Sequence, residues 1–236
     1  MTTYVLRHGQ ANYSKRYLVN GDPSQPIHLT EEGRQSLSLG WPTLPLHTVR
    51  TWLTSEFPRA QQTASLLMGV PAAEPVIEPR LNELDYGEFE GRPFLEYAVW
   101  LDGQGPNERP AGGTESQRAG IRRMLTGLLA TLERPGPRVL VGHGLLASVL
   151  LWHQNRSPKE AMPLFFPEAP YVEPIAIPDD ELPNWVTALM SDLDRDVPGG
   201  RADRGGADIF RIGEGSAVAT VDSVSHQPDQ KDLPHA

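Results

Sequence analysis

The segment Thr3-Tyr4-Val5-Leu6-Arg7-His8-Gly9 changes from apolar, β-prone side chains to an arginine, a histidine and a glycine. Such a run predicts a short buried strand that ends in a polar loop. Two later segments repeat the pattern: the run 49–54 stops at Ser55, and the run 138–141 stops at Gly142-His143-Gly144. Side chains that can take part in catalysis or ligand binding therefore directly follow three predicted strands.

Helical patterns lie between these strands. One helix is predicted to open at Thr30-Glu31-Glu32, where the threonine can cap and the carboxylates favour the positive end of the helix dipole. Another is predicted from Pro58 to Gly69, and the clearest begins at Thr114, which forms a capping-box pattern with Gln117. Strands that alternate with helices predict an α/β fold, a three-layer sandwich with a mostly parallel central sheet and helices on both faces.

Composition excludes several classes of site and partner. The 236 residues contain no cysteine, which rules out disulfides, zinc-thiolate sites and cysteine nucleophiles. The formal net charge of −9 disfavours a nucleic-acid partner or an anionic membrane surface, because both need a basic field. The N-terminal residues lack a signal-peptide pattern, and the longest apolar segment, Leu145–Trp152, is far shorter than a membrane span. We therefore expect a cytoplasmic protein.

The polar residues after the strands favour phosphate chemistry. In an open α/β sheet the ligand site lies outside the carboxyl ends of the strands, and that edge is predicted to hold Arg7, His8, Ser55 and His143. A histidine offers a nitrogen nucleophile, an arginine offers a planar fork for phosphate oxygens, and the adjoining glycine lets the backbone approach closely. With Arg59, which follows the middle strand, cationic or cationisable groups gather on one edge of an acidic protein.

At this point the sequence closely resembles the histidine phosphatase superfamily, also called the phosphoglycerate mutase-like family. The matching segments occur in the family's order and span roughly the first 155 residues, the size of one such domain. They are Leu6-Arg7-His8-Gly9-Gln10, Leu29-Thr30-Glu31-Glu32-Gly33-Arg34-Gln35, residues 54–64, Leu81-Asn82-Glu83-Leu84-Asp85-Tyr86-Gly87-Glu88-Phe89-Glu90-Gly91, and Leu140-Val141-Gly142-His143-Gly144.

The resemblance implies a role for each motif residue. His8 would be the nucleophile that becomes phosphorylated, and Arg7, Arg59 and His143 would hold the phosphoryl oxygens. Glu83 would donate a proton to the leaving oxygen, starting protonated and later accepting a proton from water. His8 must be neutral to attack, whereas His143 is more useful as a cation, so we expect their pKa values to be pushed apart. Such a cationic pocket needs no metal and no cofactor.

Other positions carry weaker expectations. Gln10, Ser14 and Glu115 occupy places that often line the pocket in relatives, although many relatives have asparagine where this chain has Ser14. The loop 22–28 is longer than usual and is predicted to lie near the pocket mouth. Without the resemblance, Glu83 would be one of several loop carboxylates, with Asp85 as the reserve acid, and Arg59 a helix-capping or ion-paired residue.

The resemblance leaves several functions open. The leading hypothesis is a metal-independent phosphatase that hydrolyses small phosphomonoesters through a phosphohistidine on His8. A cofactor-dependent phosphoglycerate mutase is the nearest alternative, but the segment 94–113 is short, and Arg109 is its sole basic residue. A non-catalytic phosphate-binding regulatory module ranks lower because the catalytic set is complete. A nucleotide-binding protein ranks lower still, since no glycine-rich phosphate loop is present.

Length fits one domain with a loose end. We expect a histidine phosphatase-like catalytic domain over residues 1–196, in which 175–177 is compatible with a final strand and 185–193 with a short helix. Residues 197–236, rich in Gly and Asp, are expected to be a mobile or loosely docked tail with one β-like stretch at 216–221. The expected partner is a small phosphorylated substrate, whose identity, like the oligomeric state, the sequence leaves open.

Overall fold

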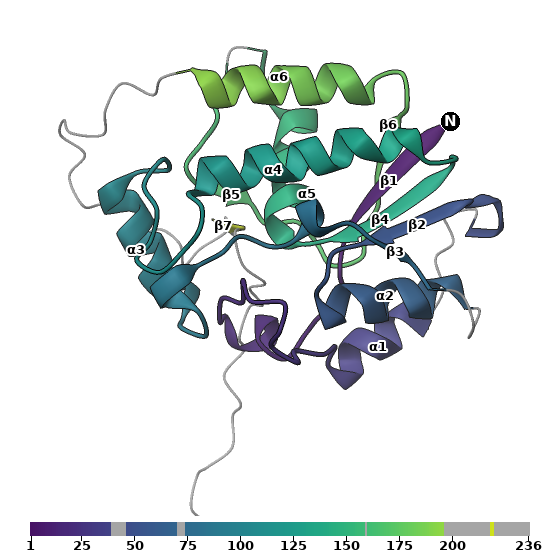
Figure 1. Cartoon of the computed structure of the whole chain (residues 1–236), viewed down its shortest axis with the longest axis horizontal. Helices are drawn as coiled ribbons and strands as arrows, with labels where there is room; N and C mark the ends of the chain where they lie inside the picture. Colours follow the sequence, from purple (N-terminus) through teal and green to yellow (C-terminus); the bar gives the residue numbers. More distant parts are fainter. Residues whose placement is uncertain (39–45, 70–73, 159, 196–217, 220–236) are drawn as a thin grey trace, which may run out of the picture.

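A five-stranded sheet forms the centre of the protein (Figure 1). The computed structural model describes residues 1–38, 46–69, 74–158, 160–195 and 218–219. In spatial order the strands are β3 (Val76–Ile77), β2 (Thr51–Thr54), β4 (Arg138–Gly142), β1 (Thr2–Arg7) and β6 (Ile175–Pro178). All neighbouring pairs are parallel except β1 with β6, which makes β6 an antiparallel edge strand.

The register of the parallel strands aligns their polar ends. Leu6 of β1 and Thr54 of β2 both lie opposite Val141 of β4. Each of these strands therefore stops at the same edge of the sheet, and the residues that follow enter neighbouring loops. This placement is what the sequence predicts for the polar residues after the strands.

Two helical layers cover the sheet, so the predicted three-layer α/β sandwich is confirmed. On one face lie α1 (Glu31–Ser38) and α2 (Pro58–Met68). The other face carries α4 (Gln117–Ala130) and α5 (Gly144–Asn155), with α6 (Leu182–Asp194) packed on α4 (Figure 1). A hydrophobic core lies on each face of the sheet, and successive strand residues point into opposite cores. Val5 packs in the core on the α4–α6 side and Leu6 in the core on the α1–α2 side.

Local signals explain where the helices begin and end. Pro58 occupies the first turn of α2, and Gly69 closes that helix with a left-handed φ of 64°. The N-cap of α4 is Ser116, whose hydroxyl accepts a hydrogen bond from the Ala119 amide at 3.2 Å. The prediction that Thr114 caps this helix is wrong, because the Thr114 hydroxyl instead donates to the Asp85 carboxylate.

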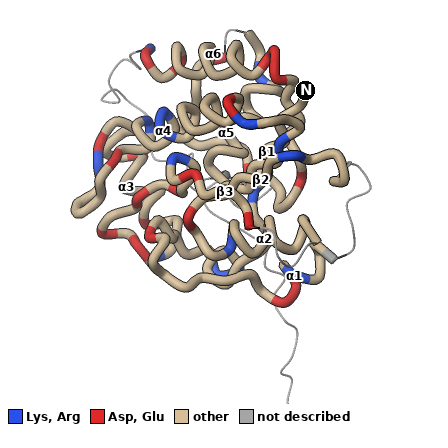
Figure 2. Tube along the Cα trace, turned by 45° about the vertical axis from the view of Figure 1, so that its right-hand side comes forward, with Lys and Arg blue, Asp and Glu red and all other residues tan. Residues whose placement is uncertain are grey.

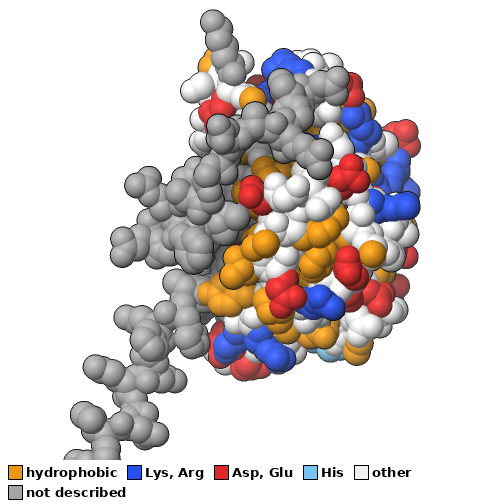
Figure 3. All heavy atoms as spheres, turned by 90° about the vertical axis from the view of Figure 1, so that its left-hand side faces the viewer, with side chains coloured by type: hydrophobic (Ala, Val, Ile, Leu, Met, Phe, Trp, Pro, Cys, Tyr) orange, Lys and Arg blue, Asp and Glu red, His pale blue; other side chains and the backbone are white. Residues whose placement is uncertain are grey.

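Several elements lie outside the motifs. Helix α3 (Phe94–Gln104) projects from the side of the sheet (Figure 1) and exposes Leu95 and Val99. Figure 3 shows apolar side chains gathered on one face of the molecule. A second, two-stranded sheet pairs β5 (Phe166–Pro167) with β7 (Val218–Ala219). The 3₁₀ helices are η1 (Ser14–Arg16), η2 (Leu46–Thr48), η3 (Pro79–Leu81), η4 (Gly87–Phe89) and η5 (Thr131–Glu133).

The expected tail, 197–236, lies outside the described residues except for β7. Over the described part of the chain, acidic and basic residues are interspersed along the backbone trace (Figure 2). In that same part, none of the helices is both long and apolar enough to cross a membrane.

Candidate active site

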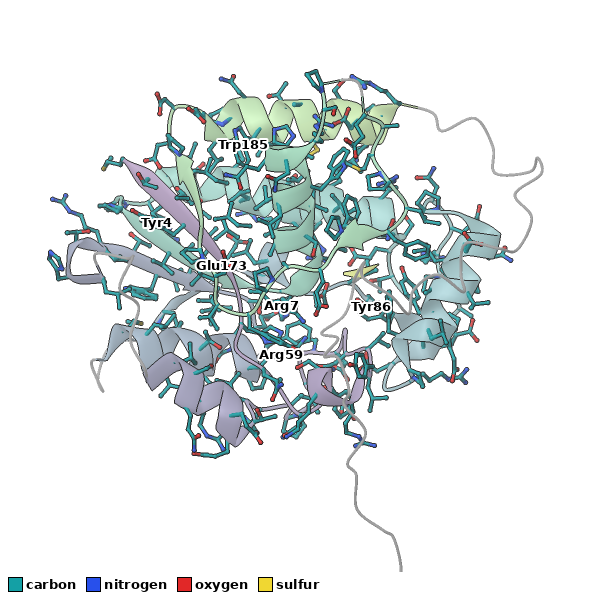
Figure 4. All side chains as sticks on the ribbon, turned by 180° about the vertical axis from the view of Figure 1, so that it is seen from behind. Tyr4, Arg7, Arg59, Tyr86, Glu173 and Trp185 are labelled. Atoms are coloured by element: carbon teal, nitrogen blue, oxygen red, sulfur yellow. The ribbon has the colours of Figure 1, made fainter. Side chains whose placement is uncertain are left out.

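Four chain segments meet at the carboxyl edge of the sheet. His8 follows β1, His143 follows β4 as the N-cap of α5, Ser55 follows β2, and Arg59 lies in the first turn of α2. The centroids of the two imidazole rings are 5.3 Å apart. Figure 4 shows Arg7 and Arg59 close together at this edge, whereas Tyr4 lies farther back along β1.

The backbone fixes the tautomer of His8. Its Nδ1 donates to the carbonyl oxygen of Gly9 at 2.7 Å, so Nε2 carries the lone pair. That Nε2 accepts a hydrogen bond from Nε of Arg59 at 2.9 Å. The imidazole is therefore neutral, and its lone-pair nitrogen, Nε2, faces Arg59. A nitrogen nucleophile requires such an unprotonated ring nitrogen.

Arg59 links the two histidines. Its Nη2 donates to Nδ1 of His143 at 3.2 Å and to the backbone oxygen of Asn20 at 3.2 Å. Its Nη1 donates to the side-chain oxygen of Asn20, and its guanidinium also lies 4.4 Å from the Phe57 ring centroid. The side chain is almost fully buried, so a helix-capping or surface role does not describe it.

Asn20 is itself held by a carboxylate from another loop. Its Nδ2 donates to Oε1 of Glu90 at 2.7 Å, and the amide of Gly21 donates to Oε2 of Glu90 at 2.6 Å. Glu90 thus joins the loop after η4 to the loop that carries Asn20. Through Asn20 it also supports one side of the Arg59 guanidinium.

His143 is neutral in this arrangement. Because Arg59 donates to Nδ1, the proton lies on Nε2, which donates to the Ser55 hydroxyl at 2.8 Å. Burial, and then the positive charge of Arg59, lower the pKa of His143 well below its usual value of 6.5. The expectation of a cationic His143 is therefore wrong, since a second proton on Nδ1 would face the Arg59 donor.

Arg7 is buried between a carboxylate and an aromatic ring. Its Nη1 donates to Oε1 of Glu168 at 3.1 Å and to the carbonyl of Ala169. The guanidinium carbon lies 3.9 Å from the centroid of the Tyr171 ring. Val172, the next residue, has a left-handed φ of 60°, and its amide donates to the Arg7 carbonyl. The segment 168–172 therefore shapes the Arg7 side of the site.

Glu83 lines a cavity next to Arg59. The cavity is small and partly open to solvent. Its walls are Ala11, Tyr13, Ser14, Leu18, Asn20, Ile27, Arg59, Glu83 and Tyr86. Oε1 of Glu83 accepts from the Leu84 amide at 2.8 Å, and the residue is 7% exposed. A carboxyl group in this enclosed place is suited to proton transfer.

The remaining candidate residues have different surroundings. Ser14 lines the cavity, but its hydroxyl is engaged by the backbone of Ala11. The side-chain oxygen of Gln10 accepts from the Thr30 hydroxyl at the start of α1. Both carboxylate oxygens of Glu115 bind Arg123, and Asp85, the reserve acid, accepts from Thr114.

Some residues of this site were not among the sequence candidates. Asn20, Glu168 and Tyr171 lie outside the motifs, and nothing in the local sequence pattern distinguishes them. Glu90 lies inside a matched motif, but nothing in the motif distinguishes its carboxylate from the neighbouring ones. In the described residues, no group of three or more histidine, aspartate or glutamate side chains is placed to hold a metal ion.

The sequence profile described as "Histidine phosphatase superfamily (branch 1)" matches residues 3–170. This chain belongs to that superfamily. This chain is 30% identical over 162 residues to the curated protein "Probable phosphoglycerate mutase GpmB" of Cronobacter sakazakii, covering 64% of this chain and 73% of the relative. The GpmB of Photorhabdus laumondii is 26% identical over 159 residues, with the same coverage.

Solved structures share the fold of this chain. The alpha-ribazole phosphatase of Shigella flexneri superposes with a TM-score of 0.57 at 24% identity, over 75% of this chain and 90% of that chain. TTHB049 of Thermus thermophilus superposes with a TM-score of 0.51 at 23% identity, over 75% and 93%. These likenesses confirm the mixed, mostly parallel sheet flanked by helices.

Proposed function

We propose that this histidine phosphatase hydrolyses small phosphomonoesters by way of a phosphohistidine on His8. The observation that carries the proposal is the state of the His8 ring: Nδ1–H is held by the Gly9 carbonyl, and the Nε2 lone pair faces Arg59. A neutral imidazole held in one tautomer is ready to attack phosphorus without losing a proton first. Guanidiniums beside it supply the charge that phosphoryl transfer needs.

The reaction has two displacements. In the first, Nε2 of His8 attacks phosphorus, the bond to the ester oxygen breaks, and the Glu83 carboxyl gives its proton to that oxygen. Arg59 exchanges its hydrogen bond to Nε2 for one to a phosphoryl oxygen, and Arg7 and His143 contact the others. In the second, water attacks phosphorus, its proton goes to Glu83, and the N–P bond breaks to release inorganic phosphate.

Water as the acceptor is favoured over a second hydroxyl of the substrate. A mutase must bind the substrate carboxylate and shield the phosphoenzyme from water. In this chain α3 carries no lysine or arginine, and Arg109, beyond it, is exposed. The phosphoglycerate mutase name of the curated relatives supports the competing function, so the decisive assay includes phosphoglycerate.

The test is phosphate release from a panel of phosphomonoesters in the presence of a chelator, with 3-phosphoglycerate included and 2-phosphoglycerate assayed in parallel. We expect release from several esters and no mutase product, together with acid-labile phosphate on the protein after brief exposure to substrate. Mutase product would overturn water as the acceptor. Absence of both turnover and acid-labile phosphate would favour a phosphate-binding module instead.

A further inference from the structure

A single guanidinium of α4 holds the loop that carries Glu83. Arg123 donates from Nη1 to the carbonyl oxygens of Arg80 and Asn82, both at 2.9 Å, and from Nη2 to that of Glu83 at 3.2 Å. We infer that Arg123 is a positioning residue that places the Glu83 carboxyl for protonation of the leaving group. The inference rests on the proposed function, in which Glu83 is the acid.

Glu115 fixes the guanidinium from the other side. Its Oε2 accepts from Nε of Arg123 at 2.9 Å and its Oε1 from Nη2 at 2.5 Å, a two-pronged ion pair that sets the plane of the guanidinium. Oε1 of Glu115 also accepts from the Asp85 amide at 3.4 Å. The pair therefore contacts the loop backbone both before and after the acid.

The loop has little regular structure of its own to hold it. It follows η3, and Glu83 lies between that 3₁₀ helix and η4 without belonging to either. Its backbone carbonyls need donors, because buried or half-buried carbonyls without partners are costly. Arg123 meets this need with side-chain donors, so the path of the loop depends on one residue of a rigid helix.

Packing of α4 against the loop leaves little room for a shift. A Cβ on Gly120 would lie 2.5 Å from Cδ1 of Leu84, and a Cβ on Gly127 would lie 2.7 Å from Cβ of Arg80. On its other side the loop is tied to the segment after β2, because Nδ2 of the Asn82 side chain donates to Oε2 of Glu56 at 2.7 Å. Glu83 is thus held between α4 and the segment that leads to Arg59.

Loss of Arg123 is expected to affect one chemical step selectively. A displaced acid cannot reach the leaving oxygen, whereas His8, Arg59 and His143 keep their own contacts. Leaving groups that depart as anions need no proton, so an aryl phosphate should be spared. A general loss of folded structure would lower turnover of all substrates alike.

The experiment compares Arg123→Ala with Arg122→Ala and Glu83→Gln. Arg122 is the matched control, since it lies on the same helix but pairs with Asp194 of α6. For each full-length variant, kcat/KM is measured with glycerol 3-phosphate and with p-nitrophenyl phosphate, and folding is checked by circular dichroism and thermal unfolding. We expect Arg123→Ala to lose at least about tenfold on the alkyl ester and less than about threefold on the aryl ester.

A double variant separates positioning from general damage. If Arg123 acts through Glu83, adding Arg123→Ala to Glu83→Gln should cause no further loss on the alkyl ester. Independent, multiplicative losses, or equal losses on both esters in a folded Arg123→Ala protein, would overturn the inference. Should Arg123→Ala fail to fold, Arg123→Lys and Glu115→Gln undergo the same comparison, with the same criterion.

Failure of the proposed function is distinguishable in the same data. If Glu83→Gln shows no preference for the aryl ester, the acid has been assigned wrongly and the proposed mechanism falls. If Glu83→Gln shows that preference but folded Arg123 variants do not, the positioning role alone is wrong.

Discussion

The Arg59 guanidinium donates a hydrogen bond to one nitrogen of each of the two histidines, and this arrangement determines the tautomer of each ring. His8 keeps a proton on Nδ1 and His143 keeps one on Nε2. The two rings are therefore alike in charge before substrate binds. They differ in the partner of the N–H group, a backbone carbonyl for His8 and a serine hydroxyl for His143.

The nucleophile is tested by His8→Ala. We expect activity below about one per cent of wild type with the fold intact, because removal of a covalent catalyst eliminates the phosphoenzyme route. Initial rates with p-nitrophenyl phosphate and circular dichroism give the two readouts. Residual activity above that level would contradict the assignment. The exposed, motif-free His47 provides a control as His47→Ala, which should leave the rate unchanged.

The pKa of His143 gives a pH prediction. Because burial and Arg59 lower it well below 6.5, an NMR titration of the ligand-free protein should show no protonation of this ring near pH 6.5. The neutral ring contributes stability above pH 6.5, which is lost as pH falls through the lowered folded-state pKa. Added inorganic phosphate should raise the midpoint, since the anion favours the imidazolium. A midpoint at or above 6.5 without phosphate would contradict the geometry.

At the scale of elements, Glu90 connects the loop after η4 to the loop that carries Asn20 and so supports the Arg59 side of the site. Glu90→Gln replaces one acceptor oxygen with a donor, so either Asn20 or Gly21 loses its partner. We expect kcat/KM to fall by about tenfold, because Arg59 then lacks a fixed neighbour. The neighbouring Glu88, which is exposed, serves as the control in Glu88→Gln. Equal rates for the two variants would show that Asn20 needs no support.

The sequence predicted the elements whose signals are local. β1, β2 and β4 follow from apolar runs, and α2 follows from Pro58 and Gly69. α3 was not predicted, because its apolar residues are spread around the helix: Tyr97 and Leu101 are buried while Leu95 and Val99 are exposed. The cap of α4 was misplaced because Thr114 and Ser116 both suit a cap, and the choice depends on Asp85, a distant residue.

In the candidate site, too, the features with local sequence signals could be predicted and those that depend on distant contacts could not. Side chains at strand ends could be placed together because parallel strands align their carboxyl ends, and this brought His8 and His143 to one edge. Contacts made by loops far apart in sequence could not be anticipated. Glu168 and Arg7 are 161 positions apart in the sequence, and Glu90 and Asn20 are 70 positions apart. The hydrophobic pattern of a sequence contains no information about such pairs.

At the scale of the whole molecule, we propose that residues 1–196 form the catalytic unit. Removal of 198–236 is then expected to leave kcat/KM within about threefold, because these residues lie outside the proposed catalytic unit. A shorter truncation of 220–236 keeps β7 and serves as the comparison, because β7 pairs with β5 next to Glu168. An inactive 1–197 protein beside an active 1–219 protein would show that β7 helps to build the Arg7 side of the site.

The guanidinium between the imidazoles also affects which ions these two rings can bind. Two neutral histidines whose ring centroids lie 5.3 Å apart would otherwise offer lone pairs to Zn²⁺ or Cu²⁺, for which imidazole is a preferred ligand. Arg59 occupies both lone pairs and adds a fixed positive charge where the ion would sit. A divalent ion would therefore have to break the hydrogen bonds from Arg59 before it could bind either imidazole.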